Sequence, residues 1–146
     1  MKSQANALPQ LIARLALGIG FLLPVADRLG FMGAPGSGVN WGDWKHFTGY
    51  AHVIMSFLPE NISNFAALIA TVAEVIFGVC LILGFRIKAN AFGSAVLTLL
   101  FAFSMVISEG ILAPFKYPVF VFAGAALLLT CTEDPKWSID SILKGR

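Results

Sequence analysis

One acidic residue, Glu74, lies within an otherwise apolar stretch that runs from Ala70 to Phe85. A carboxylate in such a stretch is costly to bury, and it is usually paired with another charge or used to bind a ligand or a proton. Ala66, Ala70, Glu74 and Gly78 recur every four residues, so Glu74 shares a helix face with small residues that allow a second helix to approach closely. The pattern predicts that Glu74 points into a helical bundle.

Arg14 is the cation that we expect to neutralise Glu74. It lies within the first apolar segment, and the helical rise of about 1.5 Å per residue places it near the depth of Glu74. We predict a buried pair that acts as a structural clasp or as the polar floor of a ligand cavity. Alternatively, Arg14 extends to the headgroups while a neutral Glu74 hydrogen-bonds a backbone carbonyl or Thr71. Water is expected to solvate three further charged residues at the outer rim, Asp27, Arg28 and Lys116.

The other reactive side chains form no recognisable catalytic or metal-binding pattern. His46 and His52 are six residues apart, which would direct them about 120° from each other around a helix. No third ligand lies nearby in the sequence, so no metal site is predicted. The sequence also lacks a Ser-His-Asp arrangement and a glycine-rich phosphate loop. It therefore identifies no catalytic residue and no evident cofactor-binding motif.

The composition is that of a membrane protein. The 146 residues are 58% hydrophobic and 12% charged, whereas soluble proteins carry about 25% charged residues. The net charge is +2 and the ten Lys and Arg residues are dispersed, which is not typical of a nucleic-acid-binding protein. The length predicts a single membrane domain, residues 1–146, with the lipid bilayer as its main partner.

Four largely apolar runs are candidates to cross a bilayer, for which about 20 helical residues are needed. They cover residues 8–26, 65–85, 89–107 and 113–131. In the fourth run, Pro114 and Pro118 suit a first helical turn, where the missing N–H has no helical partner in any case. The predicted fold class is all-α, an integral membrane four-helix bundle with an outer loop at 30–61 and a tail at 132–146.

The predicted outer loop contains a helical pattern of its own. Apolar residues recur at helical spacing from Trp44 to Leu58, before Pro59. Trp41, Trp44 and Tyr50 are residue types that settle at the headgroup level. We predict an amphipathic interfacial helix anchored by these aromatic residues, and a lid over a binding site is the alternative.

The distribution of basic residues predicts the orientation, because Lys and Arg accumulate on the cytoplasmic side of short loops. The four predicted spans put seven basic residues on one side of the membrane: Lys2, Arg14, Arg86, Lys88, Lys136, Lys144 and Arg146. Three lie on the other side: Arg28, Lys45 and Lys116. We therefore predict a multi-pass protein of the cell (inner or plasma) membrane with both termini in the cytoplasm.

Two short motifs point to a known family. They are Arg14-Leu-Ala-Leu-Gly18 with Phe21, and Glu74-x3-Gly78-x5-Gly84-x-Arg86 leading into a small-residue third helix. Together they resemble the DoxX family of small four-helix membrane proteins. The resemblance implies a membrane subunit of a quinone- or sulfur-linked redox complex. It also implies quinone as the cofactor and soluble redox proteins as the partners that carry the chemistry.

A second function is consistent with the residues themselves. A small-molecule binding, transport or membrane-assembly protein would use the buried Glu74 site without a redox role. The two possibilities differ in whether a quinone or a redox partner accompanies the protein.

Overall fold

The computed structural model describes residues 7–133 and 135–145, which contain helices and irregular segments but no β-strand. The helices in this part of the chain are α2 (Ala7–Arg28), α3 (Trp44–Ile54), α4 (Glu60–Leu83), α5 (Ile87–Glu109), α6 (Ala113–Lys116), α7 (Val119–Thr130) and α8 (Ile139–Lys144). The all-α prediction is confirmed. By length and composition, α2, α4 and α5 are each able to cross a membrane.

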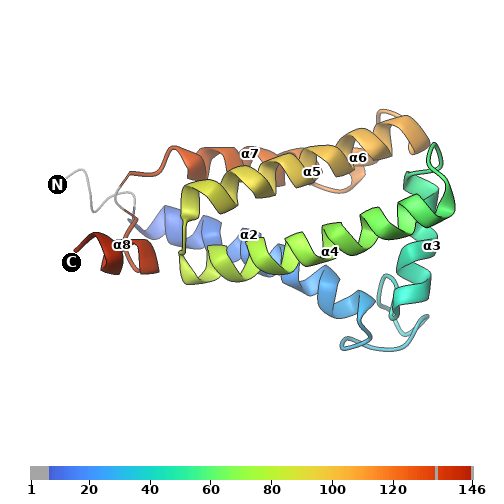
Figure 1. The fold of residues 1–146 in the computed structure, drawn as a ribbon, viewed down its shortest axis with the longest axis horizontal. Helices are drawn as coiled ribbons and strands as arrows, with labels where there is room; N and C mark the ends of the chain where they lie inside the picture. Colours follow the sequence, from blue (N-terminus) through green and yellow to red (C-terminus); the bar gives the residue numbers. More distant parts are fainter. Residues whose placement is uncertain (1–6, 134, 146) are drawn as a thin grey trace.

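The longer helices form two packed pairs, α2 with α4 and α5 with α7 (Figure 1). The contacts between the two pairs are less extensive than those within them. All four helices contribute to one apolar core: Leu17, Phe21, Leu81, Ala91, Ala95, Ala126 and Leu129. Helix α3 lies across one end of the bundle, and α8 lies at the other end.

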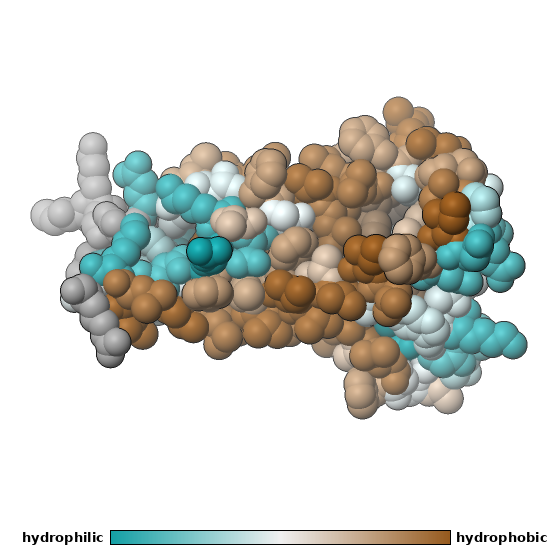
Figure 2. All heavy atoms as spheres, in the orientation of Figure 1, coloured by the Kyte–Doolittle hydropathy of each residue, from teal (hydrophilic) through white to brown (hydrophobic). Residues whose placement is uncertain are grey.

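Apolar residues cover the middle of the molecular surface. Figure 2 shows hydrophobic residues along the central part of the long axis and hydrophilic residues gathered towards both ends. Large apolar side chains such as Phe65, Leu100 and Phe103 are exposed on α4 and α5. Because an apolar surface of this extent is unfavourable in water, it fits helices that are surrounded by lipid.

The bounds of α4 differ from the predicted span 65–85. The helix begins at Glu60, directly after Pro59, and ends at Leu83. Polar residues such as Asn61 and Ser63 interrupt an apolar run, but they do not interrupt a helix. The helix ends because Gly84 adopts a left-handed conformation, φ +68°, which glycine reaches at little cost.

The prediction of one continuous helix over 113–131 is wrong. The segment divides into α6 and the 12-residue α7, with Tyr117 and Pro118 between them. Tyr117 has extended backbone angles, φ −105° and ψ +132°, because the ring of a following proline disfavours the helical conformation. Pro118 also lacks the N–H that a continuous helix would use.

The predicted outer loop at 30–61 contains α3. This helix begins after Asp43, whose side chain accepts a hydrogen bond from the His46 backbone N–H. That hydrogen bond holds the pKa of the Asp43 carboxyl below its usual value. The helix buries Phe47, Ala51 and Ile54 and ends at Ile54, one turn before the end of the predicted pattern. The predicted tail at 132–146 likewise contains a short helix, α8.

Candidate functional site

Glu74 forms an ion pair with Arg28, the last residue of α2. Glu74 Oε2 lies 2.7 Å from Arg28 Nη1, and the two side chains are only 6% and 3% exposed. Arg28 Nη1 also donates a hydrogen bond to Thr71 Oγ1 at 2.8 Å, and Arg28 Nε donates to the carbonyl oxygen of Pro24 at 3.1 Å. The ion pair therefore joins α2 to α4 inside the bundle.

The contact between Arg28 and Glu74 is close but is not an aligned hydrogen bond. Glu74 Oε2 accepts no hydrogen bond of good geometry from any described residue, although Arg28 Nη1 is 2.7 Å away. The two findings agree if Arg28 directs its N–H groups mainly at Thr71, leaving an electrostatic contact to the carboxylate. A buried carboxylate oxygen in this position retains the capacity to accept a hydrogen bond.

Two aromatic rings cover the guanidinium of Arg28. Its Cζ lies 3.9 Å from the ring centre of Phe47 and 5.3 Å from that of Trp41. The two rings contact each other edge to face, with 5.3 Å between their centres. A cation above an aromatic face is stabilised by the charge distribution of the ring. Trp41, which we predicted at the headgroups, packs over the Arg28 guanidinium; its depth in a membrane stays a prediction.

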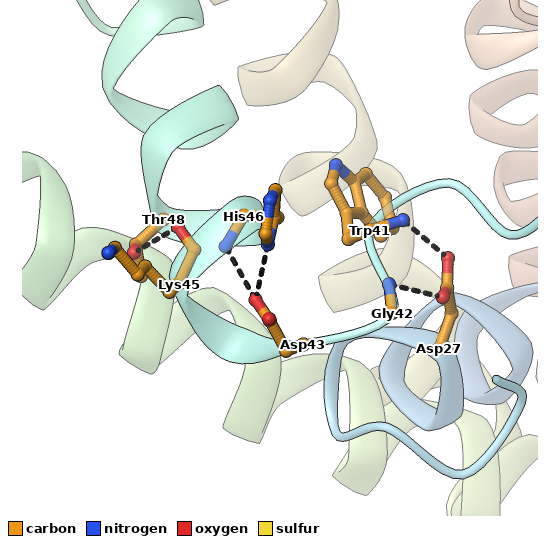
Figure 3. A network of polar contacts seen from close by, with 7 residues as sticks. All are labelled: Asp27, Trp41, Gly42, Asp43, Lys45, His46 and Thr48. Atoms are coloured by element: carbon orange, nitrogen blue, oxygen red, sulfur yellow. Dashed lines mark hydrogen bonds and ion pairs between the residues drawn. The ribbon is translucent and has the colours of Figure 1, made fainter. Parts of the chain in front are cut away.

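Asp27 holds the segment that carries this aromatic cover (Figure 3). Its carboxylate accepts hydrogen bonds from the backbone N–H groups of Asn40, Trp41 and Gly42 at 2.9–3.2 Å. Gly42 has φ +72°, and a Cβ at this position would lie 2.5 Å from the backbone nitrogen of Pro35. The turn therefore requires glycine here.

The prediction of a solvated rim formed by Asp27 and Arg28 is wrong, because both residues are buried. Consecutive helical residues point about 100° apart, so Asp27 faces the loop while Arg28 faces α4. The loop folds back over the end of α2 and excludes water from both. The third predicted rim residue, Lys116, has an exposed side chain at the end of α6.

Glu74 also lines a cavity of about 180 Å³ between α2, α4, α5 and the segment 117–122. Phe21, Phe101 and Phe122 form much of its apolar wall. Thr98 and Tyr117 add hydroxyl groups to the lining, and Thr98 Oγ1 donates to the Ser94 carbonyl oxygen at 2.7 Å. A few polar groups within apolar and aromatic walls are typical of a small-molecule binding site.

A second cavity, of about 430 Å³, lies between α3, α4 and α5 and is almost entirely apolar. Phe101 lines both cavities, and Ala70, one helical turn before Glu74, lines the second. The two cavities therefore adjoin at Phe101. A polar site next to an apolar one suits a molecule with a small polar head and a hydrocarbon chain.

The predicted pair between Arg14 and Glu74 is wrong. Arg14 is fully buried, at 0% exposed, and it donates hydrogen bonds to four backbone carbonyl oxygens at 3.0–3.3 Å. The acceptors are Leu81 and Ile82 at the end of α4, and Lys136 and Trp137 in the C-terminal segment. The alternative, in which Arg14 extends to the headgroups, is also wrong, because its guanidinium is used inside the protein.

The register of α2 against α4 explains the change of partner. The two helices run antiparallel, and a Cβ at Gly18 would lie 2.8 Å from the carbonyl oxygen of Gly78. This close contact sets Arg14 level with Leu81, which is about 10 Å along α4 from Glu74. It also confirms that the small-residue face of α4 receives a neighbouring helix.

The two histidines have separate partners. His46 Nδ1 lies 2.8 Å from Asp43 Oδ1 at the exposed start of α3 (Figure 3), and His52 Nδ1 lies 3.0 Å from Ser63 Oγ. Within residues 7–133 and 135–145, no group of three or more His, Cys, Asp or Glu residues is placed to hold a metal ion.

Thr71, which the sequence suggested as a partner of Glu74, instead accepts a hydrogen bond from Arg28. Several other residues of this site were not identified from the sequence. Phe47, Phe101 and Tyr117 come from other elements and carry no sequence signal that links them to Glu74. No protein-family model, curated protein or solved structure matches the chain.

Proposed function

We propose that this protein crosses the cell membrane four times and binds a small lipid-soluble molecule beside Glu74 and Arg28. The observation that carries the proposal is a buried carboxylate that lines a cavity of about 180 Å³. One of its oxygens accepts no aligned hydrogen bond from the described residues. A ligand hydroxyl in the cavity would supply the missing donor in surroundings where such a bond is strong.

The ligand that we favour is a quinone. Its ring would lie against Phe21, Phe101 and Phe122, and its isoprenoid chain would occupy the apolar cavity beyond Phe101. Reduction of a quinone to a quinol produces hydroxyl groups, which are the donors that Glu74 lacks. The resemblance to the DoxX family supports the same ligand. In this role the protein is a membrane subunit of a quinone- or sulfur-linked redox complex, and soluble partners carry the electron-transfer centres.

Ligand-dependent stability tests this function. The protein purified in mild detergent is heated with and without a short-chain quinol, and bound lipid-soluble compounds are identified by mass spectrometry. We expect the quinol to raise the melting temperature of the wild-type protein, because it binds only the folded state. Phe101→Trp should remove the effect by filling the cavity, and Glu74→Gln should weaken it.

Phe103→Trp is the matched control, since Phe103 lies on the same helix with its side chain exposed. It should leave the response to the quinol unchanged. Equal stabilisation by a branched hydrocarbon without oxygen atoms would contradict the proposal, because Glu74 would then have no part in binding.

A second function, in membrane assembly or transport, is favoured by a different observation. Arg28 links α2 to α4 through Thr71 and Glu74, and Asp27 fixes the loop above them. The same residues could therefore serve mainly to hold a surface for a partner membrane protein. Recovery of that partner with the wild-type protein, and no bound quinone, would favour this function over the first.

For the orientation, we propose that the end carrying α8 faces the cytoplasm. The basic residues described near that end are Arg14, Arg86, Lys88, Lys136 and Lys144, and those towards the other end are Arg28, Lys45 and Lys116. Lys2 and Arg146, which entered the prediction from sequence, lie outside the described residues. The excess of basic residues supports the proposed orientation through the positive-inside rule.

A further inference from the structure

A third cavity lies at the α8 end of the molecule, between the first turn of α5 and the C-terminal segment. Its volume is about 270 Å³, and Arg86, Lys88, Asp140 and Lys144 are among the residues that line it. Three of these four side chains are cations. The cavity is far from Glu74 along the bundle, and neither proposed function uses it.

The acidic residue in this cavity is already engaged. The carboxylate of Asp140 accepts hydrogen bonds from the backbone N–H groups of Arg86 and Ile87 at 2.8 and 2.9 Å. The backbone N–H of Asp140 in turn donates to the carbonyl oxygen of Gly84 at 3.0 Å. Asp140 therefore joins the C-terminal segment to the first amide groups of α5 and takes the place of a helix cap.

Arg86 and Lys88 are the cations of the cavity that are available to a ligand. The Arg86 guanidinium and the Lys88 ammonium are exposed, and neither has a hydrogen bond or ion pair with any other described residue. Because the Asp140 carboxylate is directed at backbone amides, the cavity carries an excess of positive charge. An anion is the complementary ligand.

Exposed apolar side chains lie in the same C-terminal segment as Asp140 and Lys144, which line the cavity. Trp137, Ile142 and Leu143 are 63%, 64% and 56% exposed in the segment that forms one side of it. Figure 2 shows hydrophobic and hydrophilic residues side by side at this end of the molecule. Tryptophan and aliphatic side chains beside basic residues are typical of a surface that lies at the boundary between headgroups and lipid chains.

We propose that this cavity binds the phosphate of an anionic phospholipid. Arg86 and Lys88 contact the phosphate, while Leu143, three residues after Asp140 on α8, and the exposed Trp137 lie against the upper part of the lipid chains. A free phosphate would gain only the charge interaction, whereas a phospholipid gains both the charge and the apolar contact. The lipid would also bridge α5 and the C-terminal segment, which Asp140 already joins.

Lipid-dependent thermal stability of the full chain in neutral detergent tests this site. The probes are phosphatidylglycerol, phosphatidylcholine with the same chains, and inorganic phosphate. We expect phosphatidylglycerol to stabilise the protein at lower concentrations than phosphatidylcholine does. In Arg86→Asn/Lys88→Gln, the concentration needed should rise roughly 25-fold, about fivefold for each basic residue lost near an anionic lipid. Asparagine is chosen because Arg86 has φ +45°, which asparagine tolerates.

The matched control is Lys45→Gln/Lys116→Gln, which removes the same charge from exposed positions towards the other end. It should respond to phosphatidylglycerol as the wild-type protein does. If the control variant also needed a higher concentration of phosphatidylglycerol, by the same factor, the proposal would be overturned. The attraction between lipid and protein would then depend only on the net charge of the protein. Equal stabilisation by inorganic phosphate would overturn the lipid as ligand. Dissociation of a dimer by the cavity variant would assign the surface to a second copy instead.

A second variant keeps the test valid if the double variant does not fold. Lys88→Gln alone changes one exposed side chain in the first turn of α5 and should weaken the response about fivefold. Native mass spectrometry of the wild-type protein provides an independent readout. Retention of phosphatidylglycerol in preference to phosphatidylcholine supports the site, and equal retention of the two overturns it.

Discussion

At the scale of single residues, Arg28 is held by groups on two sides. Glu74 and Thr71 contact it from α4, and the rings of Trp41 and Phe47 cover it from the loop and α3. Each group stabilises the charged form of arginine in an interior where water is scarce. The ion pair is therefore both a link between elements and the polar part of the candidate ligand site.

Removing one partner of this ion pair should destabilise the protein more than removing both. Arg28→Leu leaves a buried carboxylate without its counter-ion, and Glu74→Leu leaves a buried guanidinium, at a cost of about 3–5 kcal/mol each. The double variant Arg28→Leu/Glu74→Leu should recover part of that loss. Thermal unfolding in detergent measures the change in stability of the two single variants and of the double variant. Strict additivity of the two single effects would show that the residues do not interact.

Arg14 should behave independently of Glu74. Arg14→Leu leaves the carbonyl oxygens of Leu81, Ile82, Lys136 and Trp137 without their donor, and we expect a loss of at least about 2 kcal/mol. Hydrogen exchange should rise in the 135–145 segment. Combining Arg14→Leu with Glu74→Leu should give the sum of the single effects to within about 0.5 kcal/mol, since the sites are not in contact. If the double variant were more stable than the sum of the single effects predicts, the result would support the pair of Arg14 and Glu74 that we predicted from the sequence.

At the scale of elements, the contact between α2 and α4 depends on two facing glycines. A Cβ at Gly78 would lie 2.8 Å from Leu22 Cγ and 3.0 Å from the carbonyl oxygen of Gly18. Because a backbone oxygen cannot move aside as a side chain can, any larger residue at position 78 must separate the helices. The same separation would draw Arg28 away from Glu74, so the helix contact controls the site.

Gly78→Ala should therefore destabilise the protein by about 1–3 kcal/mol, as expected for overpacking at a close contact. Gly124→Ala is the matched control, because Gly124 lies within α7 and a Cβ there would meet nothing within 4 Å. The control should be neutral or more stable by up to about 1 kcal/mol, the difference in helix propensity. Thermal unfolding measures the change in stability of both variants. Equal changes would show that the space between α2 and α4 at Gly78 can accept a methyl group.

At the scale of the whole molecule, the two ends differ in charge and in what covers them. Helix α3 lies at one end and α8 at the other (Figure 1). The rings of Trp41 and Phe47 cover Arg28 at the α3 end, and Arg86, Lys88 and Lys144 line the cavity at the α8 end. The proposed orientation places α3 outside the cell and α8 in the cytoplasm.

Single-cysteine labelling tests the orientation. In a background that lacks Cys80 and Cys131, Ser37→Cys should react with an impermeant thiol reagent in intact cells, because Ser37 is exposed in the loop before α3. Glu133→Cys, exposed before the C-terminal segment, should react only after the membrane is permeabilised. Labelling of both positions in intact cells would contradict the proposed placement of the α8 end in the cytoplasm.

The sequence by itself determined the helical class, the three long apolar helices and the burial of Glu74. These properties follow from local patterns, because a run of apolar residues and the spacing of small residues are each contained within a single helix. Helix ends were less predictable. The start of α4 at Glu60 and the break at Tyr117 depend on polar helix formers and on a proline, which a count of apolar residues does not register.

Only the tertiary structure decided which charges meet. The partner of Glu74 depends on how far α2 is displaced along α4. Arg14 contacts Leu81, about two turns from Glu74, so Arg28, about four turns further along α2, is the residue that reaches Glu74. The glycine contact between the helices sets that displacement, and the folding of the loop onto Asp27 removes Arg28 from water. These features join residues far apart in the chain, so the site becomes visible only when the helices are packed together.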